Sequence, residues 1–347
     1  MLQVGIVGLP NVGKSTLFVA LTKKQVPCEN FPFCTIDPNV GVVGVADARL
    51  EVLAAIEHSA KTVPTAVEFV DIAGIVEGAH KGEGLGNKFL AAIREVDAIC
   101  HVIRAFEDSN VHHVAGSVNP DRDRGTIITE LVLADVGTMQ RIAENVARDA
   151  RGGSADAVAK KVFSERLVAH LNDGNPAVSF ERTVEEVLFM KEWHLLTDKP
   201  IVEVINSKTS GQPSEPGRVY MDIKLESELA SLEGDELQTY LKELGLEEPA
   251  LNRLVRVCYS ALDLLTFFTA GEMEARAWTV QRGGTAPEAA GKIHGDFQEK
   301  FIKAEIVSYD DFVAVGGWKG VKEKGKMRLE GKTYVMQEGD VVYFHHG

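Results

Sequence analysis

Residues 8–15 of the chain read Gly8-Leu9-Pro10-Asn11-Val12-Gly13-Lys14-Ser15. This run satisfies the pattern G-x-x-x-x-G-K-[ST], the phosphate-binding loop or P-loop, at every position. A short apolar, β-branched segment, 2–7, precedes it, and a segment with helical spacing of apolar residues, 15–22, follows it. A strand, the loop and a helix are therefore expected in that order, which favours a phosphate site over an ordinary glycine-rich turn.

The chemistry of a P-loop explains these residue types. Glycines let backbone N–H groups turn toward phosphate oxygens, and the helix that begins near Lys14 directs the positive end of its dipole at them. The Lys14 ammonium is predicted to neutralise the β- and γ-phosphates and so to act in catalysis, and the Ser15 hydroxyl to bind Mg²⁺. A P-loop alone leaves open whether the phosphate is hydrolysed, transferred or only bound.

Two further motifs indicate a conformational switch. The run D-I-A-G at 71–74 follows an apolar segment, so Asp71 is expected at a strand end, where its carboxylate holds Mg²⁺ through water. The Gly74 N–H is positioned to sense the γ-phosphate, and Thr35 lies where switch GTPases have a threonine that closes over Mg²⁺. Each motif is weak alone, but their order and spacing support one another. The predicted metal ligands are Ser15, Thr35 and Asp71.

Length and composition limit the class of protein. The chain has 347 residues, more than one hydrophobic core usually accommodates, so two or three domains are expected. Apolar residues make up 45% and charged residues 25%, which argues against a wholly disordered or membrane-spanning chain. The 37 basic and 51 acidic residues give a net charge of −14, which argues against indiscriminate coating of nucleic acid.

Charge is uneven along the chain. Residues 291–347 hold 9 basic and 9 acidic residues, so the acidity lies in the first 290 residues. Five of those basic residues fall between Lys319 and Arg328, opposed only by Glu323, and we name this run the basic strip. A solvated surface is the more common explanation of such a run, and a localised contact with RNA is the alternative.

Cysteine usage and hydropathy predict a cytoplasmic protein. The cysteines Cys28, Cys34, Cys100 and Cys258 lack C-x-x-C spacing, which favours reduced thiols over a disulfide framework or a zinc site. No apolar stretch approaches the roughly 18 residues that span a bilayer, and the first residues lack the basic region of a signal peptide. No contact with a membrane is expected.

The apolar pattern divides the chain into three parts. Runs at 67–70, 98–103 and 200–205, separated by helical stretches, predict an α/β domain with a parallel-rich sheet. Between 127 and 196 apolar residues recur at helical spacing, and glycines near 152 predict a reversal that Ser154 or Asp156 caps. After about 265 the pattern predicts a small α+β domain, with a strand at 275–280, a helix at 287–297 and a closing hairpin around Gly339.

Four segments carry a specific resemblance: the P-loop, N-F-P-F-C-T-I-D-P-N at 30–39, D-I-A-G-I-V-E-G-A-H-K-G-E-G-L-G-N at 71–87, and G-G-T-A-P-E-A-A-G-K-I-H at 283–294. The chain resembles the YchF family of Obg-like ATPases over essentially its whole length. The resemblance implies a P-loop nucleotide-binding domain at 1–126 and 197–264, interrupted by an α-helical coiled-coil domain at 127–196. A C-terminal β-grasp, ubiquitin-like TGS domain at 265–347 is implied as well.

The resemblance also implies a catalytic histidine. Ras-like switches orient the attacking water with a glutamine just after D-x-x-G, but this chain has Ile75, which forms no side-chain hydrogen bond. The family pattern places its catalytic histidine at His113, whose imidazole can orient or deprotonate water near neutral pH. His112 and His80 are the competing candidates, and an isolated loop histidine is more often a solvated surface residue.

The segment expected to contact the base departs from two recognition motifs. The run after 200–205 is Asn206-Ser207-Lys208-Thr209, which lacks the aspartate of the guanine-selecting N-K-x-D motif and the glutamate of the family's N-x-x-E. ATP is predicted, with GTP also bound. Asp222 either contacts the purine amino group or is a loop surface residue, and the surface interpretation is favoured. The residues predicted to bind nucleotide are Asn11, Val12, Gly13, Lys14, Ser15, Thr16, Gly74 and Asn206.

The sequence therefore predicts a Mg²⁺-dependent nucleoside triphosphate hydrolase that works as a conformational switch, with K⁺ bound at Asn11 as a further hypothesis. A GTP-preferring switch, a nucleotide-stabilised scaffold with incidental turnover and a small-molecule phosphotransferase are the alternatives. The resemblance implies association with ribosomes or translation factors. The basic strip on the TGS domain is a candidate RNA contact, and the sequence does not indicate the oligomeric state.

Overall fold

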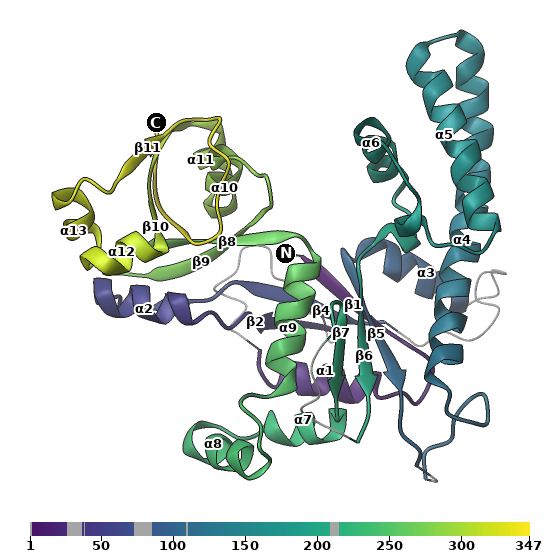
Figure 1. The fold of residues 1–347 in the computed structure, drawn as a ribbon, viewed down its shortest axis with the longest axis horizontal. Coiled ribbons are helices and arrows are strands. Elements are labelled where there is room, and N and C mark those ends of the chain that lie inside the picture. The colour runs from purple at the N-terminus through teal and green to yellow at the C-terminus, as the bar shows by residue number, and fades with distance from the viewer. Residues whose placement is uncertain (1, 26–36, 38, 73–84, 109, 209–214) are drawn as a thin grey trace.

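The computed structural model describes residues 2–25, 37, 39–72, 85–108, 110–208 and 215–347. Two six-stranded sheets and a helical arm organise this part of the chain (Figure 1). None of the helices in these ranges combines the length and the apolar composition that a membrane span requires.

The first sheet has the strand order β2-β4-β1-β5-β6-β7. Its strands are β1 (Gln3–Val7), β2 (Val40–Gly44), β4 (Ala66–Asp71), β5 (Ala98–Arg104), β6 (Ile201–Asn206) and β7 (Arg218–Met221). All neighbours are parallel except β2 and β4, so the predicted parallel-rich sheet is confirmed. The antiparallel β2 and the short β7 had no recognisable sequence signal. The helices of this domain are α1 (Lys14–Thr22), α3 (Leu85–Glu95), α7 (Ile223–Leu229), α8 (Gly234–Glu243) and α9 (Ala250–Ala261).

The parallel order determines where the site forms. Strands β1, β4 and β6 run in the same direction and are all close to the centre of the sheet. Their carboxyl ends therefore meet at one edge, which brings the P-loop after β1 close to Asp71 and Asn206. Every residue of β5 is buried, so the sheet beneath this edge is packed on both faces.

A helical arm interrupts the first domain between β5 and β6. It consists of α4 (Pro120–Asp149), α5 (Ala155–Asn172) and α6 (Val184–Trp193), with short 3-10 turns η3 (Ala150–Gly152), η4 (Ala177–Ser179) and η5 (Leu196–Asp198). The reversal predicted near 152 is confirmed: Gly153 has φ 76° and the Ser154 hydroxyl accepts the Ala157 N–H. α4 begins at Pro120, ahead of the change in apolar period, because Asn119 caps it and proline suits a first helical position.

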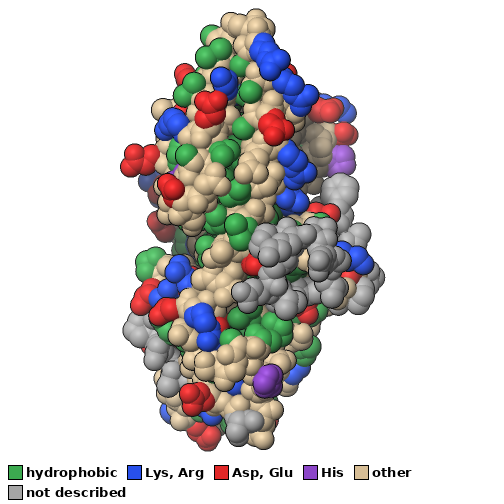
Figure 2. Space-filling model, turned by 90° about the vertical axis from the view of Figure 1, so that its right-hand side faces the viewer, with side chains coloured by type: hydrophobic (Ala, Val, Ile, Leu, Met, Phe, Trp, Pro, Cys, Tyr) green, Lys and Arg blue, Asp and Glu red, His purple; other side chains and the backbone are tan. Residues whose placement is uncertain are grey.

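The arm has its own aromatic core and a fixed base. The Phe163 and Trp193 rings stack with centroids 5.3 Å apart between α5 and α6. At the base, the buried Asp135 carboxylate of α4 accepts hydrogen bonds from the Leu196 and Thr197 N–H groups at 2.9 and 2.8 Å. Figure 2 shows the outward face of the arm, where apolar side chains lie among charged ones.

The second sheet forms most of the C-terminal region, in the order β11-β10-β12-β8-β9-β3, where β3 is Thr62–Val63. Its C-terminal strands are β8 (Leu264–Ala270), β9 (Ala275–Gln281), β10 (Phe301–Ser308), β11 (Arg328–Glu330) and β12 (Asp340–His346). The accompanying helices are α10 (Ala286–Ile293), α11 (Gly295–Glu299), α12 (Tyr309–Val315) and α13 (Trp318–Glu323). The predicted strand at 275–280 is confirmed, and the predicted helix at 287–297 is divided in two by His294, whose φ is −159°.

The predicted closing hairpin around Gly339 is wrong. The residues before the turn, 332–337, form no strand, and β12 pairs instead with β10 and β8. The turn before β12 docks elsewhere: Glu338 accepts the Thr266 N–H at 2.9 Å and binds the Arg49 guanidinium at 2.6 Å. Alternation of apolar residues predicted the strand but could not identify its partner.

The segment between β2 and β4 packs against the C-terminal sheet. It contains α2 (Ala48–Glu57) and β3 (Thr62–Val63), and β3 extends that sheet by pairing in parallel with β9, Thr62 opposite Ala275. Leu50 and Leu53 of α2 are buried in one cluster with Phe268 and Phe312. A piece of the first domain is therefore part of the second hydrophobic core.

Replacing Leu53 by alanine is expected to destabilise the C-terminal sheet, because the fully buried side chain leaves a cavity between α2 and the strands. A loss of about 2–5 kcal/mol in the free energy of unfolding follows from such truncations. Urea unfolding monitored by tryptophan fluorescence measures it. Val52→Ala is the matched control, since Val52 is 38% exposed on the same helix. Equal stabilities of the two variants would contradict this packing.

Candidate nucleotide site

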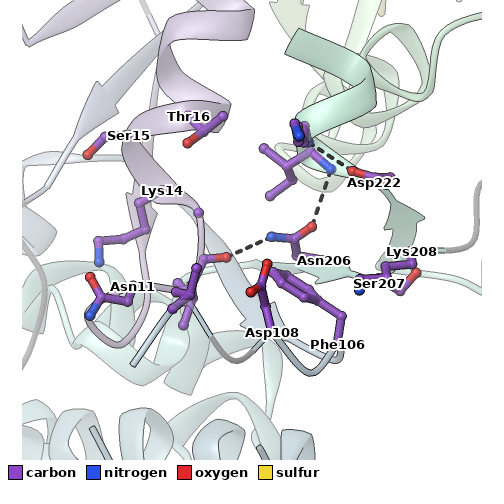
Figure 3. Close-up of a pocket in the computed structure, with 15 residues that line it drawn as sticks. Asn11, Lys14, Ser15, Thr16, Phe106, Asp108, Asn206, Ser207, Lys208 and Asp222 are labelled. Atoms are coloured by element: carbon purple, nitrogen blue, oxygen red, sulfur yellow. Dashed lines mark hydrogen bonds between the residues drawn. The ribbon is translucent and has the colours of Figure 1, made fainter. Parts of the chain in front are cut away.

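A cavity of about 750 Å³ opens at the carboxyl edge of the first sheet (Figure 3). The P-loop forms one wall, and the end of β6 and the start of α7 form the opposite one. Its volume lies within the range of small-ligand sites. The lining residues outside the P-loop are Phe106, Asp108, Val111, Asn206, Ser207, Lys208, Asp222, Ile223 and Lys224.

Two glycines of the P-loop cannot be replaced without strain. Gly13 has φ 108°, and a Cβ there would lie 2.8 Å from Asn206 Nδ2. A Cβ on Gly8 would lie 2.5 Å from the Val102 carbonyl oxygen of β5. The motif glycines thus allow close approach to β5 and to Asn206, as well as exposing the loop N–H groups.

Asn206 ties the two walls of the cavity together. Its Nδ2 donates to the Val12 carbonyl at 2.9 Å, and its Oδ1 accepts the Ile223 N–H at 3.2 Å. One buried amide therefore connects the P-loop, the end of β6 and the first turn of α7. Because both ends of the amide are engaged, Asn206 positions the cavity walls in addition to lining the cavity.

Lys14 is buried within the P-loop. Its Nζ donates to the carbonyl oxygens of Gly8 and Leu9, at 3.1 and 2.9 Å. Burial lowers the pKa of Lys14, and the Asp71 carboxylate opposes that shift. Burial likewise raises the pKa of Asp71, against the effect of Lys14 and of a hydrogen bond from Ser15. Each charge is thus held in a partly dehydrated site, where electrostatic interactions are stronger than in water.

The donor set around Ser15 fits a magnesium ion. Ser15 Oγ lies 3.5 Å from Asp71 Oδ2, so a hydroxyl and a carboxylate from different elements face the same space. Hard oxygen ligands of this kind, completed by water and phosphate oxygens, are what Mg²⁺ prefers. Thr35, the third predicted ligand, lies outside the described residues. No cluster of three or more His, Cys, Asp or Glu in the described ranges forms an alternative metal site.

Most residues predicted to bind nucleotide line one cavity. These are Asn11, Val12, Gly13, Lys14, Ser15, Thr16 and Asn206. Gly74 and the competing His80 lie outside the described residues. Asn11 also contacts the loop that follows β5, because its Nδ2 donates to the His112 carbonyl at 3.2 Å.

His113 does not line the cavity. Its side chain is buried, and its Nε2 lies 2.8 Å from Asp123 Oδ2 at the start of α4. Its Nδ1 accepts the Ala115 N–H at 3.1 Å. The neighbouring His112 is exposed. Both ring nitrogens of His113 are thus engaged by protein partners.

Sequence reasoning missed the residue that shapes the wall next to His113. Arg104 ends β5 and is 1% exposed, and its guanidinium donates to the carbonyls of Phe106 and Val111 at 3.0 and 3.1 Å. It also lies 4.7 Å from the centroid of the Phe106 ring. A charged residue at the end of a run that is apolar except for His101 was the available signal.

The interpretation of Asp222 as a plain surface residue is wrong. Asp222 is half-buried, lines the cavity and caps α7, because its Oδ1 accepts the N–H groups of Lys224 and Leu225 at 3.0 and 3.2 Å. The cap was recognisable as an aspartate just before an apolar-periodic segment. Its place at the cavity depends on the pairing of β6 and β7, which the sequence did not indicate.

Two family models match the chain. One, described as 50S ribosome-binding GTPase, matches residues 3–129. The other, for the C-terminal region of YchF GTPases and described as a protein of unknown function, matches residues 264–347. Together they cover the P-loop part of the first domain and the C-terminal sheet.

Full-length relatives are similar throughout. Ribosome-binding ATPase YchF of Bacillus subtilis (strain 168) is 50% identical over 99% of this chain and 98% of its own length. Obg-like ATPase 1 of Rattus norvegicus is 40% identical, over 99% and 92%. The solved structure of the Schizosaccharomyces pombe YchF GTPase superposes with a TM-score of 0.87 at 33% identity, covering 99% of this chain and 97% of that one. The chain belongs to the YchF family.

Proposed function

We propose that this protein hydrolyses a nucleoside triphosphate, preferentially ATP, in a Mg²⁺-dependent cycle that switches its association with the ribosome. The observation that carries the proposal is the cavity lined by P-loop residues 11–15 and Asn206, beside which Ser15 Oγ lies 3.5 Å from Asp71 Oδ2. Relatives named ribosome-binding ATPase, similar over nearly the full length, support the ribosomal partner and with it a cytoplasmic location.

The residues of the cavity have separable tasks in this reaction. Lys14 donates to the carbonyls of Gly8 and Leu9 within the P-loop, and with nucleotide bound its ammonium would neutralise β- and γ-phosphate oxygens. Ser15 would bind the magnesium ion directly and Asp71 through water, and the ion would neutralise charge on the leaving phosphate. Asn206 holds the base-side wall against the P-loop while this occurs.

His113 is the proposed residue that orients the attacking water. Replacing His113 by alanine is expected to lower kcat at least about tenfold, because removal of a general base commonly costs about 10². Nucleotide affinity is expected to change little, since His113 lies outside the cavity lining. Steady-state phosphate release and titration with a fluorescent nucleotide measure the two quantities.

The matched control for this variant is His112→Ala, which removes an exposed imidazole next door and keeps the backbone carbonyl that Asn11 contacts. Its kcat is expected to stay within about twofold of the wild type. Loss of activity in His112→Ala with normal turnover in His113→Ala would transfer the role to His112.

Adenine is the proposed base. The carboxylate that guanine-selecting sites place three residues after the asparagine is missing, because Thr209 occupies that position. Asp222 is the carboxylate at the base-side wall, and we assign it to capping α7. GTP binding remains part of the proposal, with lower affinity than ATP.

ATP is expected to displace a fluorescent nucleotide analogue at a concentration about tenfold lower than GTP does. Asp222→Ser is the informative variant, since serine preserves a helix cap and removes the carboxylate. The ratio of the two affinities should stay within about twofold in this variant. A selective loss of either nucleotide would show that Asp222 contacts the base.

A bound K⁺ at Asn11 is a secondary part of the proposal. Asn11 has φ 61°, and its Nδ2 donates to the His112 carbonyl. The amide oxygen Oδ1 of Asn11 takes no part in that hydrogen bond. That oxygen is a suitable ligand for a monovalent cation beside the phosphates.

Ribosome co-sedimentation with the full chain tests partner and switch together. More protein is expected in the ribosomal pellet with a non-hydrolysable ATP analogue than with ADP, because only differential affinity for two states can make a switch. Equal binding in both nucleotide states would favour a scaffold with incidental turnover. Phosphate release that required an added metabolite would instead favour a phosphotransferase.

A further inference from the structure

The first turn of α4 carries a buried carboxylate that the reaction described above does not use. Asp123 is 3% exposed, and its Oδ2 lies 2.8 Å from His113 Nε2. Its other oxygen, Oδ1, accepts from Arg122 Nε and Nη2 at 3.1 and 2.9 Å. Both oxygens of the carboxylate are therefore engaged, one by the arginine and one by the histidine.

The hydrogen bonds define which nitrogen of His113 carries the proton. Nδ1 accepts the Ala115 N–H, so it holds a lone pair and no hydrogen. The proton of the imidazole is then at Nε2, which donates it to the Asp123 carboxylate. Neither nitrogen is available to a water molecule in this arrangement, and His113 is outside the lining of the cavity.

We propose that Asp123 is a positioning residue that holds His113 in a resting position, and that His113 reaches the attacking water only when this bond opens. The inference rests on the role proposed for His113 in hydrolysis. A hydrogen bond from imidazole to an ionised, buried carboxylate is stronger than one between neutral groups. The resting position of His113 is therefore favoured until another hydrogen-bond donor binds Asp123 or a movement of α4 displaces the carboxylate.

The position of Asp123 is determined by its neighbours on α4. Arg122 also donates through Nη2 to the Ser117 carbonyl at 2.6 Å, which closes the loop that carries His113. Arg124 pairs with Glu203 of β6, and Glu203 also binds Arg218 at 2.8 Å. Three successive residues at the base of the arm thus contact the loop, the histidine and the sheet. A shift of α4 relative to β6 would move Asp123 away from His113.

The test compares Asp123→Ala with the wild type in steady-state hydrolysis by the full chain. Turnover is expected to rise roughly tenfold with little change in KM, which is the population shift expected when one charge-assisted hydrogen bond is lost. Asp123→Asn keeps an acceptor without the charge, so its kcat should fall between the two. Asp121→Ala is the matched control, because Asp121 is an exposed carboxylate on the same helical turn.

The double variant Asp123→Ala/His113→Ala should be as slow as His113→Ala alone. A gain in turnover that persists without His113 would overturn the inference, as would a lower kcat in Asp123→Ala. If the alanine variant does not fold, which its thermal unfolding would reveal, a kcat of Asp123→Asn at or below the wild-type value overturns the inference.

A readout independent of activity separates this inference from the proposed function. Nitrogen-15 NMR of the His113 ring in the wild-type chain should give a protonated Nε2 and an unprotonated Nδ1, and Asp123→Ala should change the Nε2 signal of that pattern, because the acceptor of its hydrogen bond is lost. An unchanged pattern, with hydrolysis still slowed by His113→Ala, overturns the role of Asp123 alone. The expected pattern with normal turnover in His113→Ala overturns the catalytic role of His113 and this inference with it.

Discussion

The hydrogen bonds of Asn206 hold together the parts on which the nucleotide site depends. A single buried side chain spans from the Val12 carbonyl to the Ile223 N–H, so the P-loop and α7 keep a constant separation. The close approach is possible because Gly13 has no Cβ, which would otherwise meet the amide at 2.8 Å. The glycine of the motif and the asparagine nearly two hundred residues later therefore form one structural unit. A larger residue at position 13 would collide with the Asn206 amide, so the contact between the two residues restricts position 13 independently of any ligand.

The first turns of α4 likewise make several contacts with the first domain within a few residues. Residues 122–124 contact three different parts of the first domain, and Ile127, one helical turn later, is fully buried in the domain's hydrophobic core. The arm is thus anchored by ion pairs at the edge of the sheet and by apolar packing above it. Any movement of α4 would therefore act directly on the contacts of residues 122–124.

Local motifs could be predicted from the sequence, and tertiary partners could not. The P-loop, the strand before Asp71 and the reversal capped by Ser154 depend on residues close together in the chain, and the structure has them where the pattern indicated. The antiparallel β2, the pairing of β12 and the cavity position of Asp222 depend on segments far apart in sequence. Arg104 is an example: its guanidinium is buried because it donates to the carbonyls of Phe106 and Val111. The conformation of the loop that supplies these carbonyls could not be predicted from the sequence. Thr35 and Gly74 stay predictions.

The docking of α2 and β3 on the C-terminal sheet means that domains defined along the chain are not separable in space. Removal of residues 265–347 would strip β9 from β3 and leave Leu50 and Leu53 facing water. Such a truncated protein would have an unpaired strand edge and an apolar helix face, both of which promote aggregation. The C-terminal sheet therefore depends on α2 and β3 of the first domain for part of its core and for one edge strand. Joining this C-terminal region to a different first domain in evolution would require that α2 and β3 be transferred with it.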